Sequence, residues 1–555
     1  MTVVETDLYR VELTGDGTLA RLESPAGEYL ASLRLLAAID TTHATDETLS
    51  TQTRVVDGAI EVERRSTVWD HARVKLVCGE ERLELHSTVT GRGVLTDARL
   101  LAGRSTQPGA LTGFLPSGSA FRSLFSPNPG DPGVIVRSAA EPAAIGVAGD
   151  GEPGRGQWFF TPAPLCLALS VDDERWLTLA ISSELDELTF TQLVYEPGDR
   201  AFNLRLDYES HTRVDGQFSA PTIVIRPGFS DPYSGLRRYR EDVGPAPRPR
   251  PVPEWWTAPI FCGWGAQCHL GWTSGKRPPD LSTQANYDGF LDHLERHGVV
   301  PGTVVVDDKW QEAYGTCVPD RDKWPDLKRW VAERRSRGQH VLLWWKAWDP
   351  EGLPAELCIC NHDGAAIAVD PTNPESREAV SQIVGGLLGL DGIDADGLKI
   401  DFTGKTPSGA SLSADGELWG IALLHELLAV VHEAAKRAKP EALLITHTPH
   451  PSFVDVTDMV RLNDMLRLGD PGPPPPVVPQ MRYRADVVRA VCPELLIDTD
   501  DWCVPDRASW REYLELKPQL GVPSLYYATH LDLSGEALEP EDYAAIRRAW
   551  ARAQG

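Results

Sequence analysis

Residues 1–240 alternate hydrophobic and polar positions in short runs, for example over 9–13, 59–63 and 202–206. Glycine, proline, asparagine and aspartate separate these runs. Alternation with a period of two buries one face of a β-strand, and many such strands divided by turn residues are typical of an antiparallel sandwich. We therefore predict an N-terminal β-sandwich domain over residues 1–244, and we find no catalytic constellation in it.

A proline-rich stretch follows, in which every second residue from Pro245 to Pro253 is proline. Alternating prolines keep a chain stiff and extended, so we predict an interdomain linker over residues 245–256. Just before it, residues 230–239 carry the signals of a short capped helix.

After the linker, apolar runs alternate with helical segments. The predicted strands are 259–264, 303–307, 340–345, 397–401, 442–446, 459–462, 495–498 and 524–528. The predicted helices include 287–297, 328–337, 376–388, 418–436 and 482–491. Eight strands with helices between them predict a (β/α)8 TIM barrel over residues 257–555. A doubly wound open sheet is the alternative, but the chain has neither the GxGxxG fingerprint nor the P-loop that would favour it.

Polar and aromatic residues stand at the carboxyl ends of these predicted strands. They include Trp264, Asp307, Asp308, Trp310, Trp344, Trp345, Trp348, Asp401, His447, His450, Asp464, Asp498, Asp500, Asp501 and His530. In a barrel these ends meet at one mouth, where active sites lie. Strand 397–401 also places Lys399 and Asp401 on one face. A buried structural Lys–Asp pair is the alternative interpretation of that strand.

Composition narrows the classes of function. A net charge of −26 is unfavourable for binding nucleic acid or an anionic membrane. Seventeen tryptophans favour a carbohydrate ligand, because indole rings stack on the apolar faces of sugars. We find no signal peptide and no apolar run long enough to span a membrane. The nine cysteines are scattered, so we expect free thiols in a cytoplasmic protein.

Many carboxylates beside tryptophans, with no metal-binding motif, indicate glycoside cleavage without a metal or another cofactor. A retaining glycosidase needs one carboxylate that attacks the anomeric carbon and a second carboxyl group that protonates the leaving oxygen. A cation such as Lys399 would keep Asp401 ionised, whereas the acid needs a raised pKa.

Several barrel segments resemble the α-galactosidase clan of retaining glycosidases, in particular the family of bacterial α-galactosidases and plant raffinose synthases. The segments are 306–311, which contains Asp-Asp-Lys-Trp where the family has Asp-Asp-Gly-Trp, then 324–327, 369–374, and the Lys-x-Asp strand 397–401. A β-sandwich before the barrel is also the family's arrangement. The resemblance implies that Asp401 is the nucleophile, that Asp307 and Asp308 bind sugar hydroxyls, and that Lys399 binds a ring hydroxyl.

The resemblance also implies that the acid/base follows the sixth strand. Asp464 is the candidate, with Asp470 and Asp500 as alternatives, although Leu-Asn-Asp-Met replaces the family's usual Ser-Asp-Asn there. The proline tract 471–479 after this strand is predicted to be a loop. The remaining candidates for substrate contact are Trp264, Trp310, Trp345, His447, Arg461 and Asp500.

Together these patterns predict a retaining α-glycosidase that hydrolyses a small α-galactoside-type carbohydrate by double displacement. The alternatives are an α-glucosidase or transglycosylase of the same clan, a metal-dependent hydrolase or lyase using His447, His450 and Asp464, and a non-catalytic sugar-binding protein. Because clan relatives often oligomerise, a homo-oligomer is plausible. The sandwich is a binding domain, a brace for the barrel, or the source of one loop at the mouth.

Overall fold

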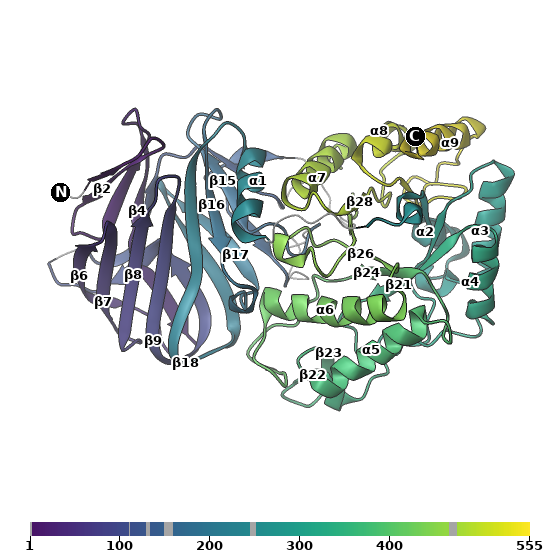
Figure 1. Cartoon of the computed structure of the whole chain (residues 1–555), viewed down its shortest axis with the longest axis horizontal. Helices are drawn as coiled ribbons and strands as arrows, with labels where there is room; N and C mark the ends of the chain where they lie inside the picture. The colour runs from purple at the N-terminus through teal and green to yellow at the C-terminus, as the bar shows by residue number, and fades with distance from the viewer. Residues whose placement is uncertain are drawn as a thin grey trace.

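The computed structural model describes residues 3–109, 111–128, 134–148, 159–244, 251–465 and 474–554. An all-β half and an α/β half lie side by side (Figure 1). The strands of the first half are β1 Val3–Glu5, β2 Arg10–Thr14, β3 Leu19–Glu23, β4 Tyr29–Arg34, β5 Ala37–Thr41, β6 Thr48–Val56, β7 Ala59–Ser66, β8 His71–Cys78, β9 Leu83–Leu100, β10 Ala102–Ser105, β11 Gly113–Ser119, β12 Ser123–Phe125, β13 Val136–Ser138, β14 Ala143–Gly146, β15 Cys166–Ser170, β16 Trp176–Ser182, β17 Gln192–Gly198 and β18 Ala201–Phe229.

The strands of this half pair almost entirely in antiparallel fashion, as the alternating pattern predicts. Leu83, Leu85 and Val89 on β9 are buried and are separated by less buried residues, which is the period-two burial of a strand with one face on a core. The long strand β18 pairs with β9, β11, β16 and β17. The described strands therefore join into one 18-stranded network, and the antiparallel character of the predicted sandwich is present.

The second half is built on eight parallel strands. They are β19 Ile260–Cys262, β20 Thr303–Val306, β21 His340–Lys346, β24 Gly397–Asp401, β26 Leu443–Thr446, β27 Met459–Arg461, β28 Leu496–Asp498 and β29 Ser524–Leu525. From β19 to β28 each strand pairs with the next, and β29 pairs with β19. A parallel bridge between Asp498 and Val522 links the two remaining edges. The sheet thus closes as a barrel, and the open-sheet alternative is wrong.

Helices surround this barrel on the right of Figure 1. They are α2 Trp264–Ser274, α3 Gln284–Arg296, α4 Leu327–Ser336, α5 Pro374–Leu388, α6 Gly420–Ala438, α7 Val477–Val491, α8 Arg507–Leu520 and α9 Pro540–Gln554. Side chains of Thr283, Asp326, Asn373 and Asp506 cap four of them by accepting backbone N–H bonds. A small sheet of β22 Cys358–Asn361, β23 Ala366–Val369 and β25 Leu412–Ser413 lies beside them. In the described part of the chain, no helix is long and apolar enough to span a bilayer.

Residues of the barrel strands alternate between an inner and an outer layer. Ile260, Val305 and Leu342 belong to a cluster inside the barrel, whereas Leu343 and Leu398 belong to the layer between strands and helices. The same alternation decides which polar side chains of these strands reach the mouth.

The helix α1, Pro232–Val243, lies at the junction of the two halves, and Asp231 caps it. The predicted helix over 230–239 is thereby confirmed. Tyr239 hydrogen-bonds His450 over 3.0 Å, and Arg240 pairs with Glu494 of the barrel half. The predicted linker lies between α1 and β19, and its residues 245–250 are outside the described ranges.

The second proline tract differs from its prediction at one end. Residues 471–473 lie outside the described ranges, but α7 begins at Val477, so the end of the tract is helical rather than a loop. Pro479 is tolerated there because the first turn of a helix needs no backbone N–H donor.

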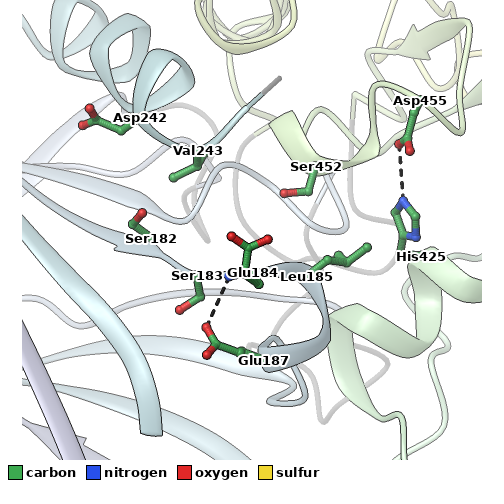
Figure 2. A pocket seen from close by; sticks show the side chains of 10 residues that line it. All are labelled: Ser182, Ser183, Glu184, Leu185, Glu187, Asp242, Val243, His425, Ser452 and Asp455. Atoms are coloured by element: carbon green, nitrogen blue, oxygen red, sulfur yellow. Dashed lines mark hydrogen bonds and ion pairs between the residues drawn. The ribbon is translucent and has the colours of Figure 1, made fainter. Parts of the chain in front are cut away.

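A cavity of about 410 Å³ also lies between the halves (Figure 2). Its lining residues are Ser182, Ser183, Glu184, Leu185, Glu187, Asp242, Val243, His425, Ser452 and Asp455. His425 and Asp455 form an ion pair at 3.3 Å across one wall. None of the sequence-predicted site residues lines this cavity.

Candidate active site

The floor of the barrel mouth holds a buried lysine, a carboxylate and a thiol. Lys399 on β24 donates to Asp307, which follows β20, over 2.7 Å, and both side chains are 3% exposed. The Cys262 thiol on β19 donates to the same carboxylate over 3.0 Å. Burial, reinforced by the charge of Asp307, holds the pKa of this thiol well above its usual range. Lys399 therefore forms its ion pair with Asp307, and not with Asp401 as the strand pattern suggested.

Arg461, at the end of β27, is the centre of the mouth. One guanidinium nitrogen donates to Asp401 over 2.9 Å. The other donates to Asp464 over 3.2 Å and to Asp500 over 2.8 Å. A single buried guanidinium thus gathers three carboxylates that come from β24 and from the segments after β27 and β28. Its fork of donors suits this arrangement.

Asp401 is held as a carboxylate. Burial alone would raise its pKa, but Arg461, Lys399 and the N–H of Phe402 outweigh burial and hold the pKa of Asp401 well below its usual range. The Trp344 indole donates to its second oxygen over 3.2 Å. The Asp401 carboxylate is therefore fixed in position and remains ionised at neutral pH.

Asp464 has the opposite electrostatic character. Burial raises the pKa of Asp464, Arg461 opposes this shift, and the negative charges of Asp500 and Asp401 add to it. Its side chain is 40% exposed, so it can meet a ligand in the mouth. Asp500, in contrast, is 0% exposed and is held by Arg461 and by backbone N–H groups of Asp501 and Trp502. The third acid candidate, Asp470, lies outside the described residues.

Asp308 stands at the rim, beside the buried Asp307. Burial raises the pKa of Asp308 to about 7, Asp307 adds to the shift, and a 2.8 Å hydrogen bond from the Tyr314 hydroxyl opposes it. Lys346 lies 4.1 Å from the Tyr314 ring and 5.4 Å from the Phe402 ring. Phe402 is 37% exposed, so an aromatic surface borders the mouth directly after Asp401.

The two histidines after β26 have different surroundings. His447 hydrogen-bonds Thr403 through Nε2 over 2.6 Å, and burial lowers its pKa to about 4. His450 uses both ring nitrogens elsewhere, one on Tyr239 and the other on the backbone N–H of Ser452. The described residues contain no group of three or more His, Cys, Asp or Glu side chains arranged to hold a metal ion. The donor geometry therefore gives no support to the metal-dependent alternative.

The tryptophans near the mouth lie in different layers of the barrel half. Trp264 packs partly exposed against the inner cluster, edge to face with Trp502 at 5.9 Å. Trp310 and Trp345 are not brought to the mouth, because both are buried in the outer layer between strands and helices. Both are removed from the set of substrate contacts on that ground. Trp344, one residue earlier on β21, is the indole that reaches Asp401.

Some motif residues are structural. Asp501 pairs with the buried Lys517 and accepts from the Trp510 indole. In segment 369–374, Asp370 accepts the backbone N–H of Asp415 over 2.7 Å, and Asn373 caps α5. These residues hold loops and helix ends rather than lining the mouth.

No protein-family model and no curated protein matches this sequence. The structure, however, resembles solved glycosidases. An α-galactosidase from Thermus thermophilus in complex with stachyose is 16% identical, with 90% of this chain and 99% of that chain covered and a TM-score of 0.53. A GH36 α-galactosidase from Geobacillus stearothermophilus is 10% identical, with coverage of 100% and 86% and a TM-score of 0.54.

A third similar structure is a GH31 sulfoquinovosidase from E. rectale, which is 11% identical, with coverage of 100% and 82% and a TM-score of 0.59. At sequence identities this low, the structural similarity establishes a shared fold and nothing finer. The chain therefore has the multidomain TIM-barrel fold of α-galactosidases and related glycosidases, which agrees with the resemblance of its short motifs to that clan.

Proposed function

We propose that this protein is a retaining α-glycosidase in which Asp401 is the nucleophile and Asp464 is the acid/base. One observation carries the proposal: Arg461 holds both carboxyl groups, yet their pKa values shift in opposite directions. Two carboxyl groups with separated pKa values are what double displacement requires.

In the first step, an oxygen of Asp401 attacks the anomeric carbon while protonated Asp464 gives its proton to the leaving oxygen. The bond to the leaving group breaks, and a covalent glycosyl ester on Asp401 remains. In the second step, Asp464, now a carboxylate, takes a proton from water as the water attacks the anomeric carbon. Asp401 is released, and the anomeric configuration is retained.

Hydroxyl groups of the bound sugar face the other polar groups of the mouth. Lys399 and Asp307 lie at its floor, and Asp308 lies at its rim. Charge-assisted hydrogen bonds, donated by Lys399 and accepted by the two aspartates, orient the ring over Asp401. Trp264 offers a partly exposed apolar face, and Phe402 borders the solvent side, from which the leaving group departs.

An α-galactoside is the proposed substrate class. Support comes from the Lys-x-Asp and Asp-Asp-x-Trp motifs and from the likeness to α-galactosidases, one of them solved with stachyose. An α-glucosidase or a transglycosylase is the second candidate, and the likeness to a GH31 glycosidase supports that other branch of the fold.

The test is turnover of a panel of aryl α- and β-glycosides by the wild type and by Asp401→Ala. We expect one α-glycoside to be hydrolysed by the wild type and not by the variant, and chelator to leave the rate unchanged. Activity that survives in Asp401→Ala and is lost with chelator would contradict the proposal. Transfer of the sugar to an added acceptor would identify the transglycosylase.

A further inference from the structure

A segment of the N-terminal half reaches the mouth of the barrel. The backbone N–H of Thr161 donates to the carbonyl of His447 over 3.0 Å. Two residues earlier, the carbonyl of Phe159 accepts from the side chain of Asn463 over 2.9 Å. Asn463 directly precedes Asp464, so this one segment contacts two of the loops that carry site residues.

The Thr161 side chain continues this contact through a chain of buried hydrogen bonds. Its hydroxyl bonds the hydroxyl of Thr403, which lies two residues after Asp401. The Thr403 hydroxyl in turn bonds Nε2 of His447 over 2.6 Å. Thr161, Thr403 and His447 are at most 4% exposed, so water does not compete for these bonds.

His447 leaves one ring nitrogen without a partner. Burial and the nearby Arg461 lower its pKa to about 4, so the ring is neutral and carries a single proton. Nδ1 is buried and has no hydrogen-bond partner among the described residues. Because buried polar atoms in native proteins are almost always paired, this unpartnered nitrogen beside the mouth is a candidate contact for a bound ligand.

The direction of the hydrogen bond at Nε2 decides whether Nδ1 is a donor or an acceptor. The proton of each threonine hydroxyl finds an acceptor when Thr161 donates to Thr403 and Thr403 donates to Nε2. The proton of His447 then resides on Nδ1, which becomes a buried donor without a partner among the described residues. In the reverse order, His447 would donate from Nε2 and the Thr403 hydroxyl would have to donate to the carbonyl of Thr161 over 3.4 Å, a longer and weaker bond than the 2.6 Å bond to Nε2.

We infer that Thr161 of the N-terminal half is a positioning residue that holds His447 with its proton on Nδ1, where it donates to a hydroxyl oxygen of the bound sugar. The identity of the ligand rests on the proposed function, whereas the position of the proton does not. The N-terminal half thus completes the sugar-binding site of the barrel through Thr403 and His447, in addition to bracing it.

The test uses ¹⁵N-histidine-labelled full-length protein, with the His447 signal assigned from its loss in His447→Gln. We expect the wild type to show the nitrogen shifts of an imidazole protonated on Nδ1. Thr161→Val should convert this to a mixture of both tautomers, and Thr161→Ser should restore the wild-type signal. Wild-type shifts that indicate a proton on Nε2 would overturn the inference without any variant, as would an unchanged signal in Thr161→Val.

Kinetics on the aryl glycoside cleaved by the wild type provide the second measurement. Loss of one hydrogen bond to the sugar should raise KM about tenfold in Thr161→Val and change kcat less. Thr212→Val is the matched control, because Thr212 makes a 3.0 Å bond to Thr189 within the same half, away from the mouth. It should leave KM unchanged. If no glycoside is cleaved but the tautomer still responds to Thr161, the proposed function fails and the positioning role stands.

Discussion

The two ends of the barrel use aspartate in opposite ways. At the amino end, before β24, Asp396 accepts from Arg335, Lys439 and the backbone N–H of Val341 at 3.0–3.2 Å. Before β27, Asp458 accepts from Lys436 over 2.7 Å and from the N–H of Leu444 over 3.0 Å. Cations and N–H donors surround both carboxylates, and those around Asp396 hold its pKa below the usual value.

At the carboxyl end, carboxylates outnumber the cations that serve them. Arg461 contacts Asp401, Asp464 and Asp500 together, and Asp401 is strongly stabilised as an anion. Asp464 and Asp308 have raised pKa values. The comparison teaches that paired charges at the amino end stabilise the fold. At the carboxyl end, crowded carboxylates have shifted pKa values, which suit these groups for proton transfer to a substrate.

The largest effect is expected from Asp401→Asn, which keeps the shape of the side chain and removes the nucleophile. The rate of glycoside cleavage should fall on the order of 10⁴-fold. The variant should still fold, because the asparagine can accept a hydrogen bond from Arg461, and a cooperative thermal unfolding transition checks this. A variant that keeps a tenth of the wild-type activity would show that Asp401 is not the nucleophile.

Asp464→Asn should lower kcat about 10³-fold for poor leaving groups and much less for activated aryl leaving groups, which need no proton. The pH profile gives the sign. The acid form is required, so wild-type activity should fall as pH rises through the raised pKa of Asp464. This alkaline limb should disappear in the variant when an activated substrate is used. Its persistence would transfer the acid role to another group.

Arg461→Met should reduce kcat/KM about 10²-fold, because the charge that keeps Asp401 ionised is lost. Leaving three carboxylates without their cation should also destabilise the fold by about 3 kcal/mol. Arg461→Lys is the matched control. It should recover part of the stability and less of the activity, because a single ammonium cannot reproduce the fork of the guanidinium. Full activity in Arg461→Met would contradict the proposal that Arg461 keeps Asp401 ionised for catalysis.

At the amino end of the barrel, Asp396→Asn should lower the free energy of unfolding and leave kcat/KM of the folded enzyme unchanged. Burial alone would raise the pKa of Asp396, but hydrogen bonds and nearby cations lower it to about 2. Because the folded-state pKa lies below the usual value, its stabilisation of about 2 kcal/mol is complete above pH 4 and is lost as pH falls toward 2. Melting temperature against pH should therefore fall less steeply in the variant, and equal slopes would contradict this account.

The sequence foretells the barrel well, because parallel strands buried on both faces appear as short apolar runs. Seven of the eight strands fall within their predicted ranges, and β21 extends one residue beyond its range, to Lys346. The positions of Asp307, Lys399 and Asp401 at the carboxyl ends of predicted barrel strands were also enough to expect them at one mouth, and in the closed barrel only β21 separates β20 from β24.

The remaining parts of the site depend on register and on contacts between distant segments. Trp344 and Trp345 are equally apolar, and only the pairing of Trp344 with Lys399 in the β21–β24 register shows which one faces inward. Cys262 gives no signal as a lone cysteine in an apolar strand. Thr161 meets Thr403 across 242 positions of sequence, and no local pattern reports such a contact.

The most direct test of the central claim is the mass of the covalent intermediate. Asp464→Ala is mixed with an activated aryl glycoside that the wild type cleaves, because the first step then proceeds while the second lacks its base. We expect the protein to gain one glycosyl group, and peptide mapping to locate it on Asp401. A glycosyl group on another residue, or release of a product with inverted configuration and no adduct, would contradict the account.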